Sequence, residues 1–463
     1  MFPAQLTPIP IRRSMLPAAL LVAALLPAYG TEYFVSPAGA DSAAGKDIHQ
    51  PLLTIQHAVD LTKPGDSVTV LDGVYKEGVL VNHSGAQGAP IVIRSLHHWG
   101  AKMITPEAAK PNSFKVGDEN SIGVAYITIC GFDCMAPGKW ASAVFSSYKA
   151  HHITVEDLYA HNCGSGGICL NDGDYRIVRN CVAAYNAWLM PYCGSGISFY
   201  GMIKADDKPG IHNLVIGNVS YGNDNGPGTS KTDADGIIID DFRDTQDSHT
   251  SKPATQNDYT GAATLVKGNL VFHNGGKGII TYLGNNITIE NNTCVRDLRR
   301  ENQGDEGELC VSNCSHVVVR NNISVISTGP EDPANHPAVV AVEILSNKDG
   351  GGHMEDVALD HNLSYDEHKP GDPSFKAKGF RCTFGADKGN LAGIDPQLAM
   401  PDDAALFGKE VPGTMEFKKY FELRAGSPAI GAGIAEGTGA SAGGKVDLGA
   451  FPSMPATRAG GSR

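Results

Sequence analysis

Aspartates crowd both ends of a short apolar run in TDADGIIIDDFRDT, residues 232–245. Asp233 and Asp235 precede three isoleucines, and Asp240 and Asp241 follow them. Carboxylates this close along a chain repel one another unless a cation lies among them, and Ca²⁺ prefers carboxylate oxygens as ligands. The stretch therefore predicts a calcium site with these four aspartates as ligand candidates. The alternative is that they are solvated turn residues, because aspartate favours turns.

The isoleucine run belongs to a strand that recurs along the chain. Similar runs are GSGGICLN (164–171), CGSGISFY (193–200), GGKGIITY (275–282) and, less clearly, DEGELCVS (305–312). The clearer runs share a glycine, found at Gly167, Gly196, Gly236 and Gly278. Strand alternation sends Ile237 and Ile239 inward and Asp240 outward. Tyr200 and Tyr282 occupy the position of Asp240 in the preceding and the following run. We expect these two tyrosines to flank Asp240 and to bind substrate.

Long insertions and basic side chains gather around the same segment. The insertions are Lys204–Gly210, Asp224–Lys231 and Arg243–Gly261. In a protein built of stacked repeats, a solenoid, insertions cluster on one face and form the walls of the binding surface. We therefore expect Arg243 and His273 to contact the substrate as well. Further cationic groups that could hold an acidic sugar are Arg296, Arg299 and Arg300.

A repeated turn residue predicts the fold class. Short strand-like runs end in a polar residue, and alignment places one such residue per run, at Asp157, Cys181, Asn218, Asn269, Asn292, Asn322 and Asn362. The steps between them are 24, 37, 51, 23, 30 and 40 residues. A minimum near 23 residues with irregular excess indicates one coil of fixed size with loops of variable length. The pattern predicts an all-β solenoid, in which an asparagine at each turn hydrogen-bonds the neighbouring coil.

Both chain ends fit a capped solenoid. Residues Ile55–Leu61 form a short amphipathic helix with Thr54 as its N-cap, and such a helix can cover the open end of the coils. We expect a single domain over residues 31–463. Its parts are an N-terminal cap with the first coils (31–100), the central coils (120–370), and a C-terminal coil with a tail (390–451).

The N-terminal residues and the net charge limit which functions are possible. Residues 1–30 combine two arginines, a short apolar run and small residues, which predicts a cleaved signal peptide and a secreted or periplasmic protein. Cleavage removes two of 37 basic residues and none of 50 acidic ones, so the mature charge is 35 − 50 = −15. An acidic chain of this kind is a poor partner for nucleic acid, and no later segment is apolar enough for a membrane. We expect a monomer.

The asparagine-bearing middle and both ends resemble the right-handed parallel β-helix, pectate-lyase-like superfamily of secreted polysaccharide-active proteins. The end motifs are IDPQL (394–398), FELRAGSPAIGAG (421–433) and DLGAF (447–451). The resemblance covers essentially the whole mature chain and implies the fold. It implies a reaction much less specifically, because this fold hosts lyases, hydrolases, epimerases and non-catalytic adhesins.

The nearest chemistry is that of polysaccharide lyase family 9, in which aspartates on neighbouring coils bind Ca²⁺ and a lysine one coil on is the base. The resemblance implies Lys277 as base and Asp235 and Asp240 at a catalytic centre that cleaves a uronate-containing polysaccharide by β-elimination. The chain departs from the family pattern where Ala234 separates two aspartates, where Ser195 replaces a carboxylate, and where Ile280 replaces the lysine.

Two alternatives stay open at this point. A glycoside hydrolase on the same fold would pair Asp235 with Asp240 or Asp241 and needs no metal. A non-catalytic glycan-binding protein would use the tyrosines alone. Sensitivity to a chelator, and the ultraviolet absorbance of an unsaturated product, distinguish these classes from a calcium-assisted lyase.

Overall fold

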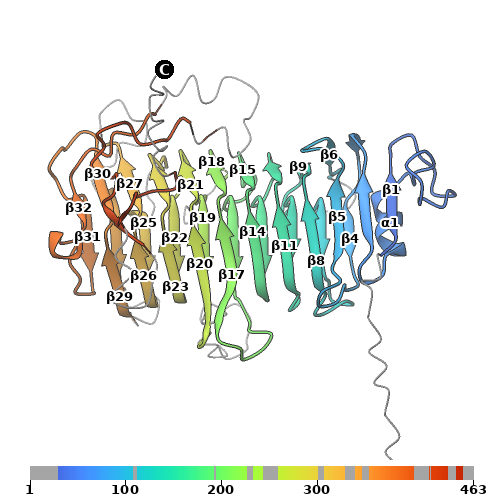
Figure 1. The fold of residues 1–463 in the computed structure, drawn as a ribbon, viewed down its shortest axis with the longest axis horizontal. Helices are drawn as coiled ribbons and strands as arrows, with labels where there is room; N and C mark the ends of the chain where they lie inside the picture. The colour runs from blue at the N-terminus through green and yellow to red at the C-terminus, as the bar shows by residue number, and fades with distance from the viewer. Residues whose placement is uncertain are drawn as a thin grey trace, which may run out of the picture.

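Three long parallel sheets run the length of the molecule (Figure 1). Each coil contributes one strand to sheet A, one to sheet B and one to sheet C before the chain returns to sheet A. The chain is thus a right-handed parallel β-helix, as predicted. The computed structural model describes residues 30–107, 112–191, 194–226, 233–242, 259–300, 307–328, 339–346, 354–400, 417, 419–435 and 445–451. Residues 1–29, which hold most of the expected signal peptide, lie outside this set.

The strands are short and pair in register with the coils before and after them. Sheet A consists of β1 (Glu32–Val35), β2 (Ser67–Val70), β5 (Ile91–Ser95), β8 (Ala125–Cys130), β11 (His151–Glu156), β14 (Asp174–Arg179), β17 (Gly210–Ile216), β20 (Ala262–Lys267), β23 (Asn285–Glu290), β26 (Ser315–Arg320) and β29 (Glu355–Asp360). Sheet B consists of β3 (Gly73–Tyr75), β6 (Ala101–Ile104), β9 (Asp133–Met135), β12 (Tyr159–His161), β15 (Val182–Ala184), β18 (Val219–Tyr221), β21 (Leu270–Phe272), β24 (Thr293–Val295), β27 (Ile323–Ile326), β30 (Leu363–Asp366) and β32 (Leu391–Ala392). Sheet C consists of β4 (Val79–Val81), β7 (Phe114–Val116), β10 (Val144–Ser146), β13 (Ile168–Asn171), β16 (Ile197–Tyr200), β19 (Ile237–Asp240), β22 (Ile279–Tyr282), β25 (Gly307–Ser312), β28 (Val340–Leu345) and β31 (Phe375–Lys378).

Buried asparagines stack at the turn between sheets A and B, one in each coil. The backbone N–H of Asn269 donates to the side-chain oxygen of Asn292 at 2.9 Å, and Asn292 donates in the same way to Asn322 at 2.9 Å. Asn218 and Asn362 extend this first ladder on either side. Each side chain satisfies backbone groups of two coils, which explains why asparagine recurs here.

The ladder differs from the sequence alignment at its ends. Asn390 adds a rung, because its side-chain oxygen accepts from the N–H of Asn362 at 2.8 Å. Cys181 takes a rung position as predicted, and its N–H donates to Asn218. The placement of Asp157 was wrong by one residue: Glu156 pairs with Arg179, so Leu158 is the residue equivalent to Cys181. Asp157 lies in the turn one position before the repeated residue, and in the sequence its polar side chain resembles the asparagines of the later coils.

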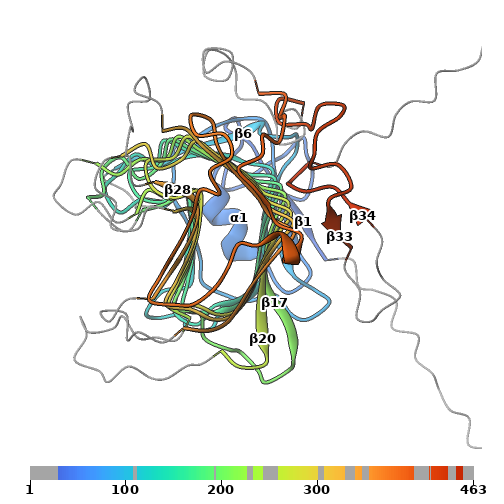
Figure 2. The same cartoon turned by 90° about the vertical axis from the view of Figure 1, so that its left-hand side faces the viewer.

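A short helix and a tail cover two surfaces of the coils. Helix α1 (Ile55–Leu61) lies at the N-terminal end of the coils, and in the view along the axis it fills their outline (Figure 2). The side chain of Thr54 caps it by accepting from the N–H of His57 at 3.3 Å, as expected. At the other end, β33 (Gly433–Ile434) and β34 (Lys445–Val446) form an antiparallel pair outside the coils. The tail buries Leu398, Phe421 and Leu448 against the outward side chains of sheet B.

Two further findings concern export. Within the described ranges, no helix has the length and apolarity needed to cross a membrane. Nine cysteines of those ranges are free thiols, most of them buried. Stacked hydrogen bonds and the packed interior hold these coils together.

Candidate functional site

The outer face of sheet C carries the row of side chains that the strand alternation predicted. Tyr200 pairs with Asp240, and Asp240 pairs with Tyr282, on the neighbouring strands β16, β19 and β22. Ile237 and Ile239 are fully buried in the interior, while Tyr200, Asp240 and Tyr282 are half-buried. Adjacent strands lie about 4.8 Å apart, so the two hydroxyl-bearing rings start roughly 10 Å apart with a carboxylate between them.

A second outward row on the same strands is apolar. Ile238, Ile280 and Cys310 pack together with Tyr282, and none of the first three is more than 7% exposed. The sequence placed Ile238 and Ile280 on the outer face, and the register confirms it. This face is thus a partly covered apolar surface with one polar row along its edge, rather than an open polar groove.

The four aspartates around β19 divide into two separate pairs. Asp233 and Asp235 lie before the strand, and Asp240 and Asp241 lie at its end. From Ile237 to Asp240 the strand alone covers about 10 Å, at about 3.3 Å per residue. Ligand oxygens must lie about 2.3–2.6 Å from a Ca²⁺ ion, so one ion cannot bind both pairs. A single ion bound by all four aspartates does not fit this separation, and within the described ranges no group of three or more His, Cys, Asp or Glu side chains gathers for a metal. Calcium binding itself stays a prediction.

The burial of two of these aspartates weighs against the carboxylate pair of a hydrolase. Asp235 is fully buried before the strand, whereas Asp240 is half-buried on the outer face at its far end. An inverting pair needs its carboxyl groups about 6.5–9.5 Å apart on either side of one sugar bond, with both groups open to the sugar. Asp241 is only 1% exposed, and its N–H donates to the backbone oxygen of Tyr282. The hydrolase stays an alternative that the products of the reaction will decide.

Lys277 lies at the turn from sheet B into sheet C, a region we call the B–C corner. Its backbone N–H donates to Asp235 Oδ1 at 2.7 Å, which joins the β19 coil to the next one. Lys277 is 2% exposed, so its side chain lies within the corner and not on the outer face of sheet C. This burial weighs against Lys277 as the base for a sugar on that face.

A second ladder of hydrogen bonds runs along the B–C corner. The N–H of Asn223 donates to Asn274 Oδ1 at 3.0 Å, and the N–H of Asn274 donates to Asp297 Oδ1 at 2.7 Å. The sequence analysis missed this ladder, although Asn223, Asn274 and Asp297 each lie five residues after a rung of the first ladder. That constant offset was the signal that could have revealed it.

The second ladder ends in a buried pair of acids. Asp297 is 6% exposed, and its backbone N–H donates to the carboxylate of Glu308, which is fully buried, at 3.1 Å. Burial raises the pKa of Asp297 to about 7. A Cβ on Gly278 would lie 2.5 Å from Asp297 Oδ2 and 3.1 Å from the backbone oxygen of Glu308, so both acids crowd this glycine. The corner therefore holds a carboxyl group that titrates near neutrality.

The remaining basic and imidazole candidates do not form one clamp. Arg300 forms an ion pair with Asp224 at the B–C corner. Arg296 points elsewhere and binds Glu367 through two hydrogen bonds of 2.7 and 2.8 Å. His273 is 8% exposed at the end of β21 in sheet B, so it does not lie on the outer face of sheet C. Arg243 lies outside the described residues.

The insertions flank sheet C on both sides, where the sequence analysis expected one face. Asp224–Lys231 connects β18 to β19 at the B–C corner, whereas Lys204–Gly210 and Arg243–Gly261 connect sheet C to sheet A. We call the second region the C–A corner. Sheet C is thus the sheet that these insertions border.

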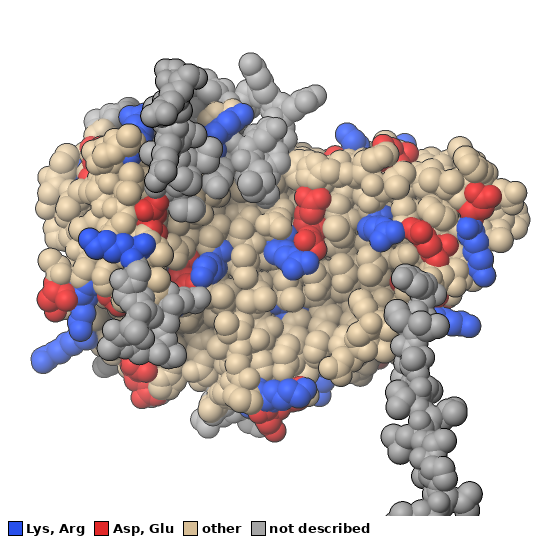
Figure 3. All heavy atoms as spheres, in the orientation of Figure 1, with Lys and Arg blue, Asp and Glu red and all other residues tan. Residues whose placement is uncertain are grey.

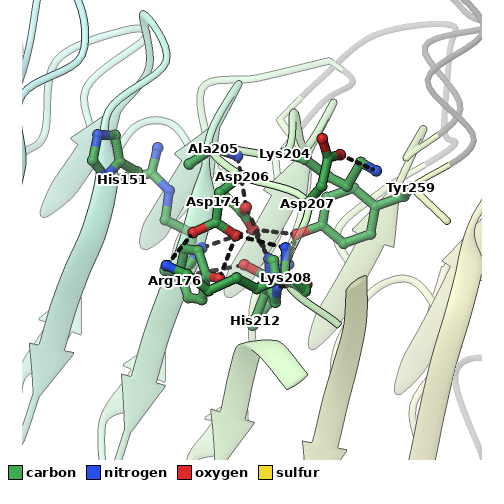
Figure 4. A network of polar contacts seen from close by, with 12 residues as sticks. His151, Asp174, Arg176, Lys204, Ala205, Asp206, Asp207, Lys208, His212 and Tyr259 are labelled. Atoms are coloured by element: carbon green, nitrogen blue, oxygen red, sulfur yellow. Dashed lines mark hydrogen bonds and ion pairs between the residues drawn. The ribbon is translucent and has the colours of Figure 1, made fainter. Parts of the chain in front are cut away.

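A buried polar network fixes the described part of the C–A corner (Figure 4). Asp174 is fully buried and accepts from the hydroxyl of Tyr259 at 2.5 Å and from the N–H of Ala205 at 2.7 Å. His212 Nδ1 lies 2.9 Å from the same carboxylate. The inward Arg176 donates to Ser146 at 2.7 Å, and burial lowers the pKa of this arginine to about 9. The network ties the Lys204–Gly210 insertion to three coils.

The geometry of His212 shows that this network is structural. Its Nδ1 faces the Asp174 carboxylate, and its Nε2 lies 2.8 Å from the backbone oxygen of Lys208. Both ring nitrogens thus have partners within the protein, and the hydroxyl of Tyr175 also lies 3.1 Å from Nε2. His212 is therefore held inside the network, where it ties the insertion to the coils.

Sheets A and B offer less surface for an acidic polymer. On the face shown in Figure 3, which carries sheet A, acidic and basic side chains lie next to each other on a mostly uncharged surface. Arg179 binds Glu156 at 2.7 Å, and Lys267 binds Glu290 at 2.6 Å. The tail covers much of sheet B, as described above. A pocket lined by Arg296, Tyr365, Glu367 and Arg424 lies between the end of sheet B and the tail. Sheet C carries the row of Tyr200, Asp240 and Tyr282, and we therefore take sheet C with its two bordering corners as the candidate site.

Comparisons with known proteins leave the reaction open. No family model matches the chain. An uncharacterized Bacillus subtilis protein, YwoF, is 27% identical over 133 residues, which is 28% of this chain and 28% of that protein. The solved structure of pectate lyase Pel9A aligns at 16% identity with a TM-score of 0.48, covering 91% of this chain and 96% of that one. A glycoside hydrolase aligns at 10% identity with a TM-score of 0.48, covering 78% and 96%.

The chain spans about a quarter of the length of the relative that it matches, and both solved structures share little sequence with it. One structure is named for a lyase and the other for a hydrolase, so the reaction of this chain has to be argued from its own residues.

Proposed function

We propose that the protein is an exported polysaccharide lyase that cleaves an acidic, uronate-containing polysaccharide by β-elimination. The observation that carries the proposal is the row Tyr200–Asp240–Tyr282, half-buried and in register on adjacent strands of sheet C. Insertions border this sheet at both corners, and the other two sheets are covered or charge-balanced. A polymer lying along the coils would meet the three side chains in turn.

The chemistry needs a group that takes the C5 proton and a proton for the leaving oxygen. In β-elimination the C5–H bond breaks, the C4–O bond breaks, and a double bond forms between C4 and C5. The phenolate form of a tyrosine can take the C5 proton, and the phenol so formed can donate that proton to the leaving C4 oxygen, so Tyr200 or Tyr282 can serve both roles where the sugar is bound. The proposal therefore moves the base from Lys277 to a tyrosine, because Lys277 is buried at the corner. Asp240 lies between the two tyrosines and can hold sugar hydroxyls.

A uronate next to Asp240 raises a charge problem. Two carboxylates at contact distance repel, and a bound Ca²⁺ would supply neutralisation of the substrate carboxylate. The residues present do not fit the four-ligand site expected from sequence, so no step of the proposal depends on the metal. Calcium dependence remains a prediction, tested by adding EDTA and then excess Ca²⁺.

The deciding experiment is Asp240→Asn assayed on a panel of acidic polysaccharides, with polygalacturonate and alginate among them. We expect the wild type to release products that absorb in the ultraviolet, and the variant to lose at least 100-fold in kcat/KM, since groups that stabilise a transition state contribute on that order. Asp207→Asn is the matched control, because that side chain is 97% exposed at the C–A corner. Full activity in Asp240→Asn would refute the site.

Product analysis and further variants distinguish the lyase from the two alternative functions. New reducing ends without ultraviolet absorbance would replace the lyase by a hydrolase, and binding without cleavage would leave a glycan-binding protein. Tyr200→Phe and Tyr282→Phe test the base: one of them should abolish turnover while binding persists. If Lys277→Ala abolishes turnover and both tyrosine variants retain it, the assignment of the base to tyrosine is wrong.

A further inference from the structure

Two tryptophans are exposed on the B–C corner, on the coils that precede β19. Trp140 lies between β9 and β10 and is 53% exposed, and Trp188 lies between β15 and β16 and is 43% exposed. The chain has three tryptophans in all. The third, Trp99, is partly buried and stacks on His98 and Tyr159 at 4.2 and 5.1 Å. Trp140 and Trp188 are thus the more exposed of the three tryptophans.

Backbone hydrogen bonds place the two exposed rings along one line of stacked connections. The N–H of Ser165 donates to the oxygen of Ala141, next to Trp140, at 2.9 Å. The N–H of Leu189, next to Trp188, donates to the oxygen of Gly164 at 3.0 Å. The connections thus follow each other coil by coil, and the two tryptophans lie two coils apart, which is roughly 10 Å at about 4.8 Å per coil.

The same line leads to the candidate site. The N–H of Gly226 donates to the oxygen of Met190 at 2.7 Å, which links the Trp188 connection to the one that precedes β19. From the coil of Trp140 to that of Tyr282 there are four coil steps, or roughly 19 Å. A single sugar ring cannot span this length, whereas an oligosaccharide can. An exposed Lys139 beside Trp140 offers a cation to an acidic chain.

We propose that Trp140 and Trp188 are stacking platforms for the sugar rings of an acidic polysaccharide that runs along the B–C corner toward β19. Each indole offers a flat apolar face for the C–H side of a pyranose ring and an N–H for its hydroxyls. The cost of leaving two large apolar side chains in water is explained by a ligand that covers them. The inference rests on the proposed function, since it extends the same site into a set of binding positions for a long chain.

Intrinsic fluorescence tests this without using turnover. Titration of the Asp240→Asn protein with oligogalacturonides, alginate oligosaccharides and neutral dextran should change the tryptophan emission saturably for an acidic ligand and leave it unchanged for dextran. Trp140→Phe and Trp188→Phe should each reduce the change, and the double variant should abolish it. An undiminished change in the double variant, or no change with any acidic ligand, would overturn the inference.

Kinetics on the active enzyme supply the second readout. Trp140→Ala and Trp188→Ala should each raise KM for the polymer roughly 3- to 10-fold, the effect of losing one aromatic contact, with kcat unchanged. Ile122→Ala is the matched control, because that apolar side chain is 66% exposed on another turn. Unchanged KM in both tryptophan variants refutes the platforms while leaving the lyase intact. Saturable binding without cleavage of any polymer refutes the lyase while leaving the platforms intact.

Discussion

Replacing Asn292 by leucine tests the hydrogen-bonded ladder that holds the coils in register. The Asn292 oxygen accepts from the backbone N–H and the side-chain amide of Asn269, both at 2.9 Å. Its own amide donates to the backbone oxygen of Val266 at 3.0 Å and to Asn322 at 2.9 Å. The side-chain amide of Asn269 keeps a bond to Val215, and Asn322 keeps the backbone N–H of residue 292, so these two groups lose only part of their bonding.

In Asn292→Leu the backbone N–H of Asn269 loses its acceptor and, unlike the two groups above, keeps no other bond. Asn269 and Asn292 are fully buried, so water cannot replace the lost acceptor. A buried group left without its partner costs about 1–3 kcal/mol, and we expect Asn292→Leu to lower the free energy of unfolding by about 2–3 kcal/mol. The measurement is the guanidinium midpoint at unchanged m-value, together with faster hydrogen exchange in the peptide that contains Asn269. Asn120→Leu, on an exposed turn, is the control. An unchanged midpoint with unchanged exchange would refute the ladder as a source of stability.

Two further perturbations address the two corners. The folded pKa of Asp297, about 7, lies above its unfolded value near 3.8, so the folded state binds this proton more tightly and loses stability as the pH rises from about 4 to about 7. Asp297→Asn should remove this fall of the unfolding free energy with pH, and the variant should be the more stable protein at pH 8, by up to about 4 kcal/mol. The measurement is a series of urea titrations between pH 4 and pH 8. Unfolding free energies of the two proteins that change in parallel with pH would contradict the prediction. Asp174→Ala removes the buried carboxylate that Tyr259, Ala205 and His212 contact and should cost on the order of 3 kcal/mol, with proteolytic cleavage appearing in the Lys204–Gly210 insertion. Asp207→Ala, on the 97% exposed neighbour, should leave both the stability and the cleavage pattern unchanged, and equal effects of the two variants would show that the network carries no stability.

The corner chemistry differs from what the resemblance implied, and the reason is burial. A resemblance to a family assigns roles to residues by their order in the sequence. Lys277 and the four aspartates are close in that order and were therefore expected to form one catalytic centre. In the folded chain the strand β19 separates the aspartates, and Lys277 is 2% exposed. Order along a chain does not show which side of a turn a side chain occupies, and a catalytic group needs access to the substrate.

The sequence by itself determined the coil. A strand buries alternate residues, so the isoleucines of residues 237–239 and their equivalents fixed which side chains point inward, and Asp240 came out between Tyr200 and Tyr282 as expected. The asparagines fixed the turns, because a buried backbone group needs a partner in every coil. These are local, periodic constraints, and a sequence displays periodicity directly. The second ladder was equally visible at its constant offset of five residues and was overlooked.

Only the tertiary structure decided which polar residues come together and which remain accessible. His212 and Tyr259 are 47 residues apart in the chain, and they meet at Asp174 because two insertions of different length return to the same corner. The tail finds the outer face of sheet B, which leaves sheet C as the candidate site. Such contacts depend on the paths of loops whose lengths follow no period. The pairing of distant polar groups therefore could not be derived from the repeat that builds the coils.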